Sequence, residues 1–252
     1  MRFVILTVGH SGSCWVAKTL NSHREVFCSH EALYQSIYPE LWRLCDIKRN
    51  RRAELALIDY LTLGTAIKGC YKAYGDVGSL YLPESWNYAK KKGLRVVVLI
   101  RHPVFVAQSQ LICSKNIGEF TVDWTYYDKV WNLKFGEYLK KISNKDELEL
   151  ICTLLRWKEM VLTEFPKVKI DDLSSSIVYF KTFFEYVTGI YLSYQESKAL
   201  LIKEKVNSHR KDNCSTVYDI FNRWNDNVQE LSIKHIADLA EKFDYRLNTL
   251  HS

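Results

Sequence analysis

Residues 3–15 read Phe3-Val4-Ile5-Leu6-Thr7-Val8-Gly9-His10-Ser11-Gly12-Ser13-Cys14-Trp15. The run Phe3–Val8 is apolar and β-branched, which predicts a buried parallel strand. Small residues then form a turn, and a helical pattern begins at Trp15. The N–H groups of such a turn and of the helix N-terminus converge on one point and favour negative charge. The glycine–serine loop, Gly9–Trp15, is therefore a predicted anion site, although an ordinary β-to-α turn explains it equally well.

The glycine–serine loop lacks the signature of a Mg²⁺-ATP site. A Walker A motif needs a lysine directly after its second glycine, and Ser13 stands at that position. The sequence also shows no clear strand that ends in the aspartate of a Walker B motif. Kinase and ATPase chemistry is therefore disfavoured.

A second anion site is predicted after Arg95–Ile100, the strongest strand signal in the chain. Arg101 follows this strand at its carboxyl end, where open α/β sheets bind their ligands. Pro103 suits the first turn of a helix, and Ser109 lies two turns later. A guanidinium and a hydroxyl so placed can hold a phosphate. The alternative is a surface arginine with a capping role.

The alternation of strands and helices predicts an α/β fold, P-loop-like, with a central parallel sheet flanked by helices on both sides. Further strands are expected at Val26–Cys28, Thr65–Cys70 and Val168–Ile170. Helices are expected at 33–60, Pro83–Lys92, Val104–Cys113, 147–164, Ser175–Val187 and 226–244. No repeat or linker interrupts the chain, so residues 1–252 are predicted to form a single domain.

Composition narrows the range of partners. The net charge of +6 over 252 residues favours an anionic ligand, but it is too small to indicate nucleic acid. No stretch of about 18 apolar residues occurs, so no membrane partner is expected. The seven cysteines show no zinc spacing, which predicts no metal and a reducing, cytoplasmic location. The sequence does not indicate an oligomeric state.

The two predicted anion sites together resemble the sulfotransferase family that uses 3′-phosphoadenosine 5′-phosphosulfate (PAPS). Its 5′-phosphosulfate loop reads Arg/Lys-Ser-Gly-Thr/Ser-x-Trp, which is similar to His10–Trp15. Its 3′-phosphate motif reads Arg-x-Pro with a serine eight residues after the arginine, as in Arg101–Ser109. Later segments also resemble the family: Lys169–Leu173, Val206–Lys211, and Trp224 with the final helix up to Tyr245.

The resemblance implies transfer of a sulfuryl group from PAPS, with 3′,5′-ADP as the second product and no metal. It implies an acceptor that is a small molecule bearing a hydroxyl or an amine or amide nitrogen. The residues that it assigns to cofactor binding are His10, Ser11, Gly12, Ser13, Cys14, Trp15, Arg101, Ser109, Arg210 and Lys211. For Arg210 and Lys211, a plain pair of surface charges is nearly as good an interpretation.

Two residues are candidates for the chemistry itself. His10 stands where the family has a lysine or arginine; a protonated imidazole would serve there, and a neutral one would donate a single, weaker hydrogen bond. One branch of the family uses a glutamate as general base, and Glu31 occupies the corresponding place. His30 is the rival base, and a helix-capping acid is the bland interpretation of Glu31.

Other segments are less informative. The other branch of the family uses a histidine as general base, and in the segment Lys68-Gly69-Cys70 that position is Cys70. Lys68 is either a residue that binds the sulfate or the acceptor, or a solvated lysine at a strand end. The aromatic segment 120–138 either covers an acceptor pocket or is an ordinary packed helix pair. Two competing functions stay open: a small-molecule kinase-like P-loop transferase, and a non-catalytic nucleotide or anion binder.

Overall fold

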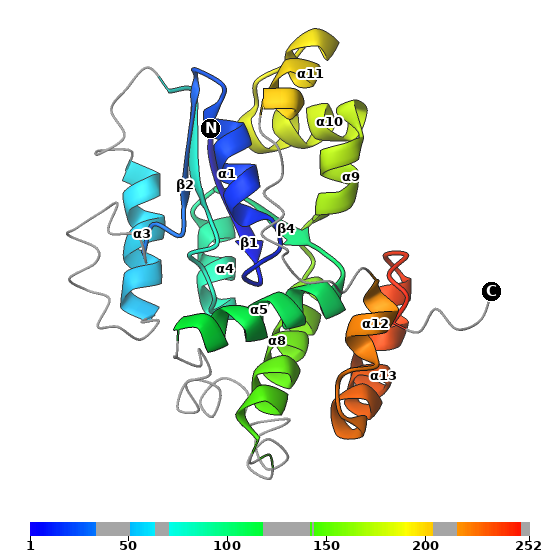
Figure 1. Ribbon diagram of the computed structural model, residues 1–252. Coiled ribbons are helices and arrows are strands. Elements are labelled where there is room, and N and C mark those ends of the chain that lie inside the picture. The colour runs from blue at the N-terminus through cyan, green and yellow to red at the C-terminus, as the bar shows by residue number, and fades with distance from the viewer. Residues whose placement is uncertain (34–50, 64–70, 118–141, 143, 204–215, 248–252) are drawn as a thin grey trace. The chain divides into compact units, whose positions relative to one another are not determined.

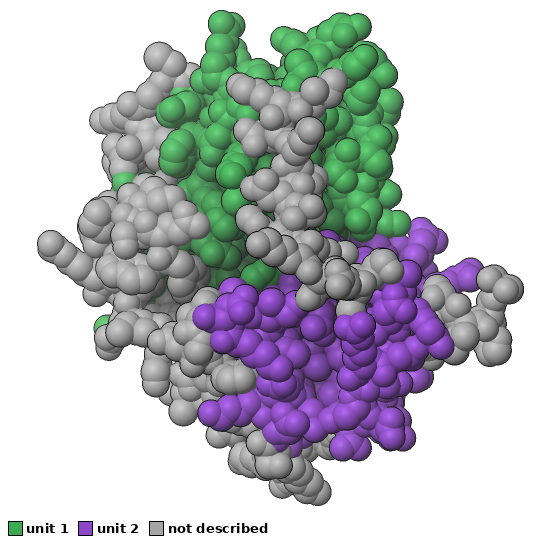
Figure 2. Space-filling view, viewed as in Figure 1, with its two compact units in different colours: residues 1–100, 163–208 green, residues 101–162, 209–252 purple. Residues whose placement is uncertain are grey.

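The computed structural model describes residues 1–33, 51–63, 71–117, 142, 144–203 and 216–247. The chain divides into two compact units, each made of two stretches of sequence (Figure 2). The first unit comprises Met1–Ile100 and Thr163–Ser208, and the second comprises Arg101–Leu162 and His209–Ser252. The single domain expected over residues 1–252 stays a prediction.

The first unit is built on a five-stranded sheet in the order β2-β3-β1-β4-β5 (Figure 1). Its strands are β1 (Arg2–Thr7), β2 (Val26–His30), β3 (Ala73–Val77), β4 (Arg95–Ile100) and β5 (Lys167–Lys169). Every pairing is parallel, and Ile5 of β1 lies opposite Val77 on one side and Val97 on the other. The expected parallel sheet is confirmed, and β1 and β4 lie within one residue of their predicted bounds.

Both faces of the sheet are buried. Because side chains alternate along a strand, Phe3 and Ile5 face one side, and Val4 and Leu6 face the other. All four side chains are at most 1% exposed. A continuous strand of this kind has water on neither face, which is why its sequence is an unbroken apolar run rather than an alternating one.

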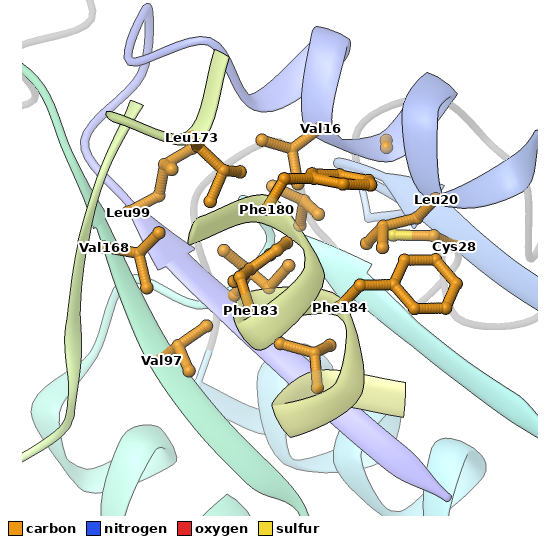
Figure 3. Packing of buried hydrophobic residues seen from close by; sticks show 14 of the residues in the cluster. Val16, Leu20, Cys28, Val97, Leu99, Val168, Leu173, Phe180, Phe183 and Phe184 are labelled. Carbon is orange, nitrogen blue, oxygen red and sulfur yellow. The ribbon is translucent and has the colours of Figure 1, made fainter. Parts of the chain in front are cut away.

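One face packs against helices α1 (Ser13–Asn21) and α10 (Ile177–Thr188) (Figure 3). Val16 and Leu20 of α1 pack with three phenylalanines of α10 and with Val97 and Leu99 of the sheet. The phenylalanines are Phe180, Phe183 and Phe184. Burying each of these rings stabilises the fold by about 1.5–3 kcal/mol. This cluster therefore fixes α1, and with it the loop that precedes α1.

Helix α10 has clear start and stop signals. The Ser176 side chain accepts a hydrogen bond from the N–H of Tyr179 at 3.2 Å, which is a serine N-cap. Gly189 ends the helix in the left-handed conformation, with φ of 71°. The helix expected at Ser175–Val187 is thus confirmed within two residues.

The remaining helices of the first unit are α3 (Arg51–Leu63), α4 (Pro83–Lys91), α9 (Ile170–Ser175) and α11 (Tyr194–Lys203). A buried carboxylate joins α3 to α4. Glu54 is 1% exposed and accepts hydrogen bonds from the backbone N–H groups of Tyr81 and Leu82, at 2.9 and 3.1 Å. These donors precede Pro83, so Glu54 holds the chain where it enters α4.

The described part of the second unit is helical. Its helices are α5 (Pro103–Ile117), α8 (Lys145–Val161), α12 (Val217–Phe221) and α13 (Asp226–Glu241). Asn144 caps α8, and Thr216 with Asp219 forms a capping box on α12. The indole N–H of Trp224 donates to Gln108 Oε1 at 3.0 Å, which links the end of α12 to α5.

Several expectations differ from the structure. The strand expected at Thr65–Cys70 lies outside the described residues, and the observed β3 begins at Ala73. Of the helix expected over 33–60, the part from Arg51 onward is described, as α3. The short helices α9, α11 and α12 were not expected. In the described part of the chain, no helix has the length and apolar character needed to cross a bilayer.

Candidate functional site

The carboxyl ends of β1, β2 and β3 meet at one edge of the sheet, because the strands are parallel. The chain continues from β1 to β2 on one side of β1, whereas β4 pairs with the other side. Such a reversal of strand order is where open α/β sheets bind ligands. The glycine–serine loop follows β1 at this edge; His30 ends β2 at the same edge, and Glu31 follows it.

Left-handed backbone shapes the glycine–serine loop. His10 has φ of 66° and Gly12 has φ of 87°, so the chain turns sharply twice before α1 begins at Ser13. The first turn of α1 contains no acidic residue. Its N–H groups have no acceptors within the helix, and the helix dipole adds positive potential there. An anion at this point meets no competing carboxylate from the first turn.

The hydroxyls of Thr7 and Ser11 brace the turn from inside. Both donate to the carbonyl oxygen of Val8, at 2.8 and 2.7 Å respectively. Both side chains are buried. In this arrangement the Ser11 hydroxyl proton stabilises the loop itself, and its expected contact with a phosphate stays a prediction.

Close packing fixes the position of Gly12. A Cβ atom added there would lie 2.8 Å from Ile170 Cγ1, at the start of α9. Since Lys169 ends β5 and Ile170 begins α9, the loop after β1 rests on the corner after β5. Ile170, in the sequence segment Lys169–Leu173, thus lies against the loop and supports it.

Cys14 and Trp15 have different surroundings. The Cys14 side chain is exposed, whereas Trp15 is 6% exposed and belongs to the apolar core cluster. The Trp15 side chain therefore packs in the core, and its backbone N–H lies in the first turn of α1. The cofactor-binding roles expected for both residues stay predictions.

His30 contacts the glycine–serine loop directly. Its Nε2 lies 2.9 Å from the Ser13 hydroxyl oxygen, which is hydrogen-bonding distance. His30 is the last residue of β2 and Ser13 is the first residue of α1, and β2 packs against α1. The imidazole is half-buried at this contact.

Glu31 lies just past β2 in an unusual backbone conformation. Its φ is 49°, and its N–H donates to the carbonyl of Val77 at the end of β3, at 2.8 Å. Gly78 follows, and a Cβ atom there would come within 3.1 Å of Glu31 Cγ. The half-buried carboxylate side chain therefore packs over the end of β3. A strained non-glycine residue of this kind is often found at functional sites.

A buried carboxylate that the sequence did not single out holds this region together. Asp76 Oδ2 accepts from the Ser29 hydroxyl at 2.6 Å and from the Ala32 N–H at 3.0 Å, and Oδ1 accepts from the Ser79 N–H at 3.0 Å. Burial raises the pKa of the Asp76 carboxyl, and the hydrogen bonds from its partners oppose this rise. In the sequence, this role of Asp76 could be inferred from its place shortly before Gly78 and Ser79, at the end of a strand.

Arg101 and Ser109 belong to the second unit. Arg101 follows β4 directly; its carbonyl accepts from the Trp157 indole N–H at 3.0 Å, and its guanidinium carbon lies 5.5 Å from the ring centre of Phe105. Ser109 is half-buried on α5. Their joint action with the glycine–serine loop on one ligand stays a prediction.

His102, between Arg101 and Pro103, is largely buried and joins the corner after β4 to a distant segment. Its Nδ1 accepts from the Val104 N–H at 3.3 Å, so its Nε2 carries the hydrogen and donates to the Arg246 carbonyl at 3.0 Å. Its ring also packs against Tyr245. Trp157 thus binds the Arg101 carbonyl, and the His102 ring bonds to the backbone of Val104 and Arg246.

Some expected site residues cannot be placed. Lys68, Cys70, Arg210, Lys211 and the aromatic segment 120–138 lie outside the described residues. Among the residues that are described, no group of three or more His, Cys, Asp or Glu side chains is arranged to hold a metal ion.

Two of the solved structures that are similar to this chain are sulfotransferases. Mouse sulfotransferase SULT7A1 complexed with PAP matches with a TM-score of 0.51 at 12% identity, over 96% of this chain and 85% of that one. A sulfotransferase from Alicyclobacillus acidocaldarius matches with a TM-score of 0.46 at 14% identity, over 97% of this chain and 95% of that one. The mouse structure shows that the chain has the fold of a sulfotransferase, as its motifs predicted. No protein-family model and no curated protein sequence matches the chain.

The contact between Gly12 and Ile170 leads to a stability prediction. We expect Gly12→Ala to lower the free energy of unfolding by about 1–2 kcal/mol for the left-handed backbone and by about 1–3 kcal/mol more for the clash. Gly93→Ala is the matched control, because Gly93 has φ of 76° but no atom within 4 Å of an added Cβ. Urea unfolding of both variants measures the difference. Equal losses would show that Ile170 does not constrain the loop.

Proposed function

We propose that this chain is a PAPS-dependent sulfotransferase acting on a small molecule with a hydroxyl or an amine or amide nitrogen. The observation that carries the proposal is the glycine–serine loop. It has left-handed residues at His10 and Gly12, leads into a helix with no acid in its first turn, and stands at the strand-order reversal of a sulfotransferase fold. The mouse relative in fold was solved with PAP, which is PAPS without its sulfuryl group.

In this proposal the loop holds the 5′-phosphosulfate. The first-turn N–H groups of α1 donate to the phosphate oxygens, and the helix dipole favours their charge. Arg101 and Ser109 bind the 3′-phosphate, joined by Arg210 and Lys211. The assignment of these four residues to the 3′-phosphate rests on the sequence pattern. A donor held at both of its phosphates presents its sulfur in one orientation, which lowers the entropic cost of reaching the transition state.

The reaction is an in-line displacement at sulfur. The acceptor oxygen or nitrogen forms a bond to sulfur as the bond from sulfur to the 5′-phosphate oxygen breaks, leaving 3′,5′-ADP. Glu31 takes the proton of the acceptor, and its position over the end of β3 suits a base at the ligand-binding edge. His10 donates to the oxygen that leaves sulfur, where negative charge develops. The chemistry needs no metal, and a cytoplasmic location is expected from the cysteines.

Ligand binding separates this proposal from a kinase-like function. We expect saturating 3′,5′-ADP to stabilise the chain, by about 2.7 kcal/mol at a concentration 100 times its dissociation constant. ATP with Mg²⁺ should give a much smaller shift, because it has no 3′-phosphate and the loop has no Walker lysine. Thermal unfolding with each nucleotide measures both effects. A larger shift with ATP and Mg²⁺ would favour the kinase-like alternative.

The role of Glu31 predicts a loss of turnover without a loss of donor binding. We expect Glu31→Gln, which keeps the shape of the side chain, to lower kcat by at least about tenfold because the base is removed. The affinity for 3′,5′-ADP should stay within about twofold. Glu84→Gln, at an exposed position in the first turn of α4, is the matched control. A smaller loss of kcat in Glu31→Gln would contradict the assignment of Glu31 as the general base.

The role of His10 predicts a pH dependence. Its cationic form stabilises the leaving oxygen better than its neutral form, so kcat should fall as pH rises through the titration of the imidazole. His10→Lys should keep a cation at this position and weaken that fall, and His10→Ala should lower kcat at every pH. Sulfate transfer from labelled PAPS, followed against pH, tests all three proteins. Unchanged turnover in His10→Ala would contradict the role.

A further inference from the structure

The glycine–serine loop contains two hydroxyls, and the structure gives them different partners. Ser11 donates to the Val8 carbonyl at 2.7 Å, so its proton points into the turn. The Ser13 hydroxyl oxygen lies 2.9 Å from His30 Nε2, and Ser13 is the first residue of α1. Of the two hydroxyls in this fully described loop, Ser13 therefore has the proton that can be turned toward an anion at the helix N-terminus.

The direction of the Ser13–His30 hydrogen bond decides whether that proton is available. If Nε2 accepts, the Ser13 proton points at the imidazole and cannot reach a ligand. If Nε2 carries a hydrogen and donates, the Ser13 oxygen accepts, and its own proton is released toward the anion. An anion at the N-terminus of α1 favours the second arrangement, because it supplies an acceptor for the freed proton.

We propose that His30 is a positioning residue of the glycine–serine loop: its Nε2–H donates to Ser13, and this turns the Ser13 hydroxyl toward the 5′-phosphate of the donor. The inference rests on the proposed function, because it assumes a nucleotide with a 5′-phosphate in the loop. It assigns His30 a task different from that of a general base. In a loop with histidine rather than lysine or arginine at position 10, a second oriented donor strengthens the grip on the phosphate.

The position of Ser13 suits a single, directed contact. Ser13 is 5% exposed, so it cannot contact several ligand atoms. One hydrogen bond from its hydroxyl to a ligand oxygen needs little exposed surface. His30 is held as the last residue of β2, where the N–H of the next residue, Glu31, bonds to Val77. The backbone that carries the imidazole is therefore fixed at the end of a strand, next to Ser13.

The test compares two ligands, 3′,5′-ADP and adenosine 3′-monophosphate, which lacks the 5′-phosphate. Isothermal titration measures the affinity of both for the unaltered chain and for His30→Leu, His30→Gln and Ser13→Ala. We expect His30→Leu and Ser13→Ala each to weaken 3′,5′-ADP by about tenfold, since one directed hydrogen bond to a charged group is lost. Adenosine 3′-monophosphate should change by less than about twofold, because the lost contact involves the 5′-phosphate.

His30→Gln separates positioning from general structural damage. Glutamine retains an N–H donor near the place of Nε2, so it should restore most of the affinity that His30→Leu loses. The double variant His30→Leu with Ser13→Ala should be no weaker than the worse single variant, because both remove the same contact. Ser22→Ala, at the other end of α1, is the matched control and should bind both ligands as the unaltered chain does.

Three results would overturn the inference while leaving the proposed function in place. These are unchanged 3′,5′-ADP binding in His30→Leu, an equal loss for both ligands, and glutamine binding as weakly as leucine. A base that acts on the acceptor alone would also give the first of these results, with a fall in kcat. Failure of the unaltered chain to bind 3′,5′-ADP would instead overturn the proposed donor, and this inference with it.

Discussion

One buried carboxylate organises the edge of the sheet where the candidate site lies. Asp76 collects hydrogen bonds from Ser29 in β2, from Ala32 in the turn after β2, and from Ser79 in the turn after β3. Hydrogen bonds to a charged group contribute about 1.5–3 kcal/mol each, and a buried carboxylate without them would be costly. The turn that carries Glu31 is thereby tied to the end of the neighbouring strand.

The sequence indicated the elements whose signal is local. The β-branched runs at Phe3–Val8 and Arg95–Ile100 predicted β1 and β4 because a buried parallel strand needs such residues. It did not predict β3, whose sequence includes Gly75 and Asp76, both poor strand formers. Gly75 lies opposite Phe3, and a Cβ there would come within 2.2 Å of the Phe3 carbonyl oxygen. Tertiary packing, not propensity, requires a glycine at that place.

The candidate site was predictable in the same partial way. A glycine–serine turn between a strand and a helix is a local pattern, so Gly9–Trp15 can be identified as a candidate anion site without the rest of the fold. The contact between Ser13 and His30 depends on the order β2-β3-β1 and on the packing of α1 against β2, and no local pattern reveals that order. No local pattern reveals the close packing of Ile170 against Gly12 either, because the two residues are far apart in the sequence.

The hydrogen bond from His102 to the Arg246 carbonyl spans 144 positions of the chain. During synthesis, the corner that follows β4 therefore cannot take its final form until the segment around Arg246 has been made. Contacts so distant in sequence cost more loop-closure entropy than local ones and slow folding. His102, next to Arg101, is thus made well before the residue that accepts this hydrogen bond.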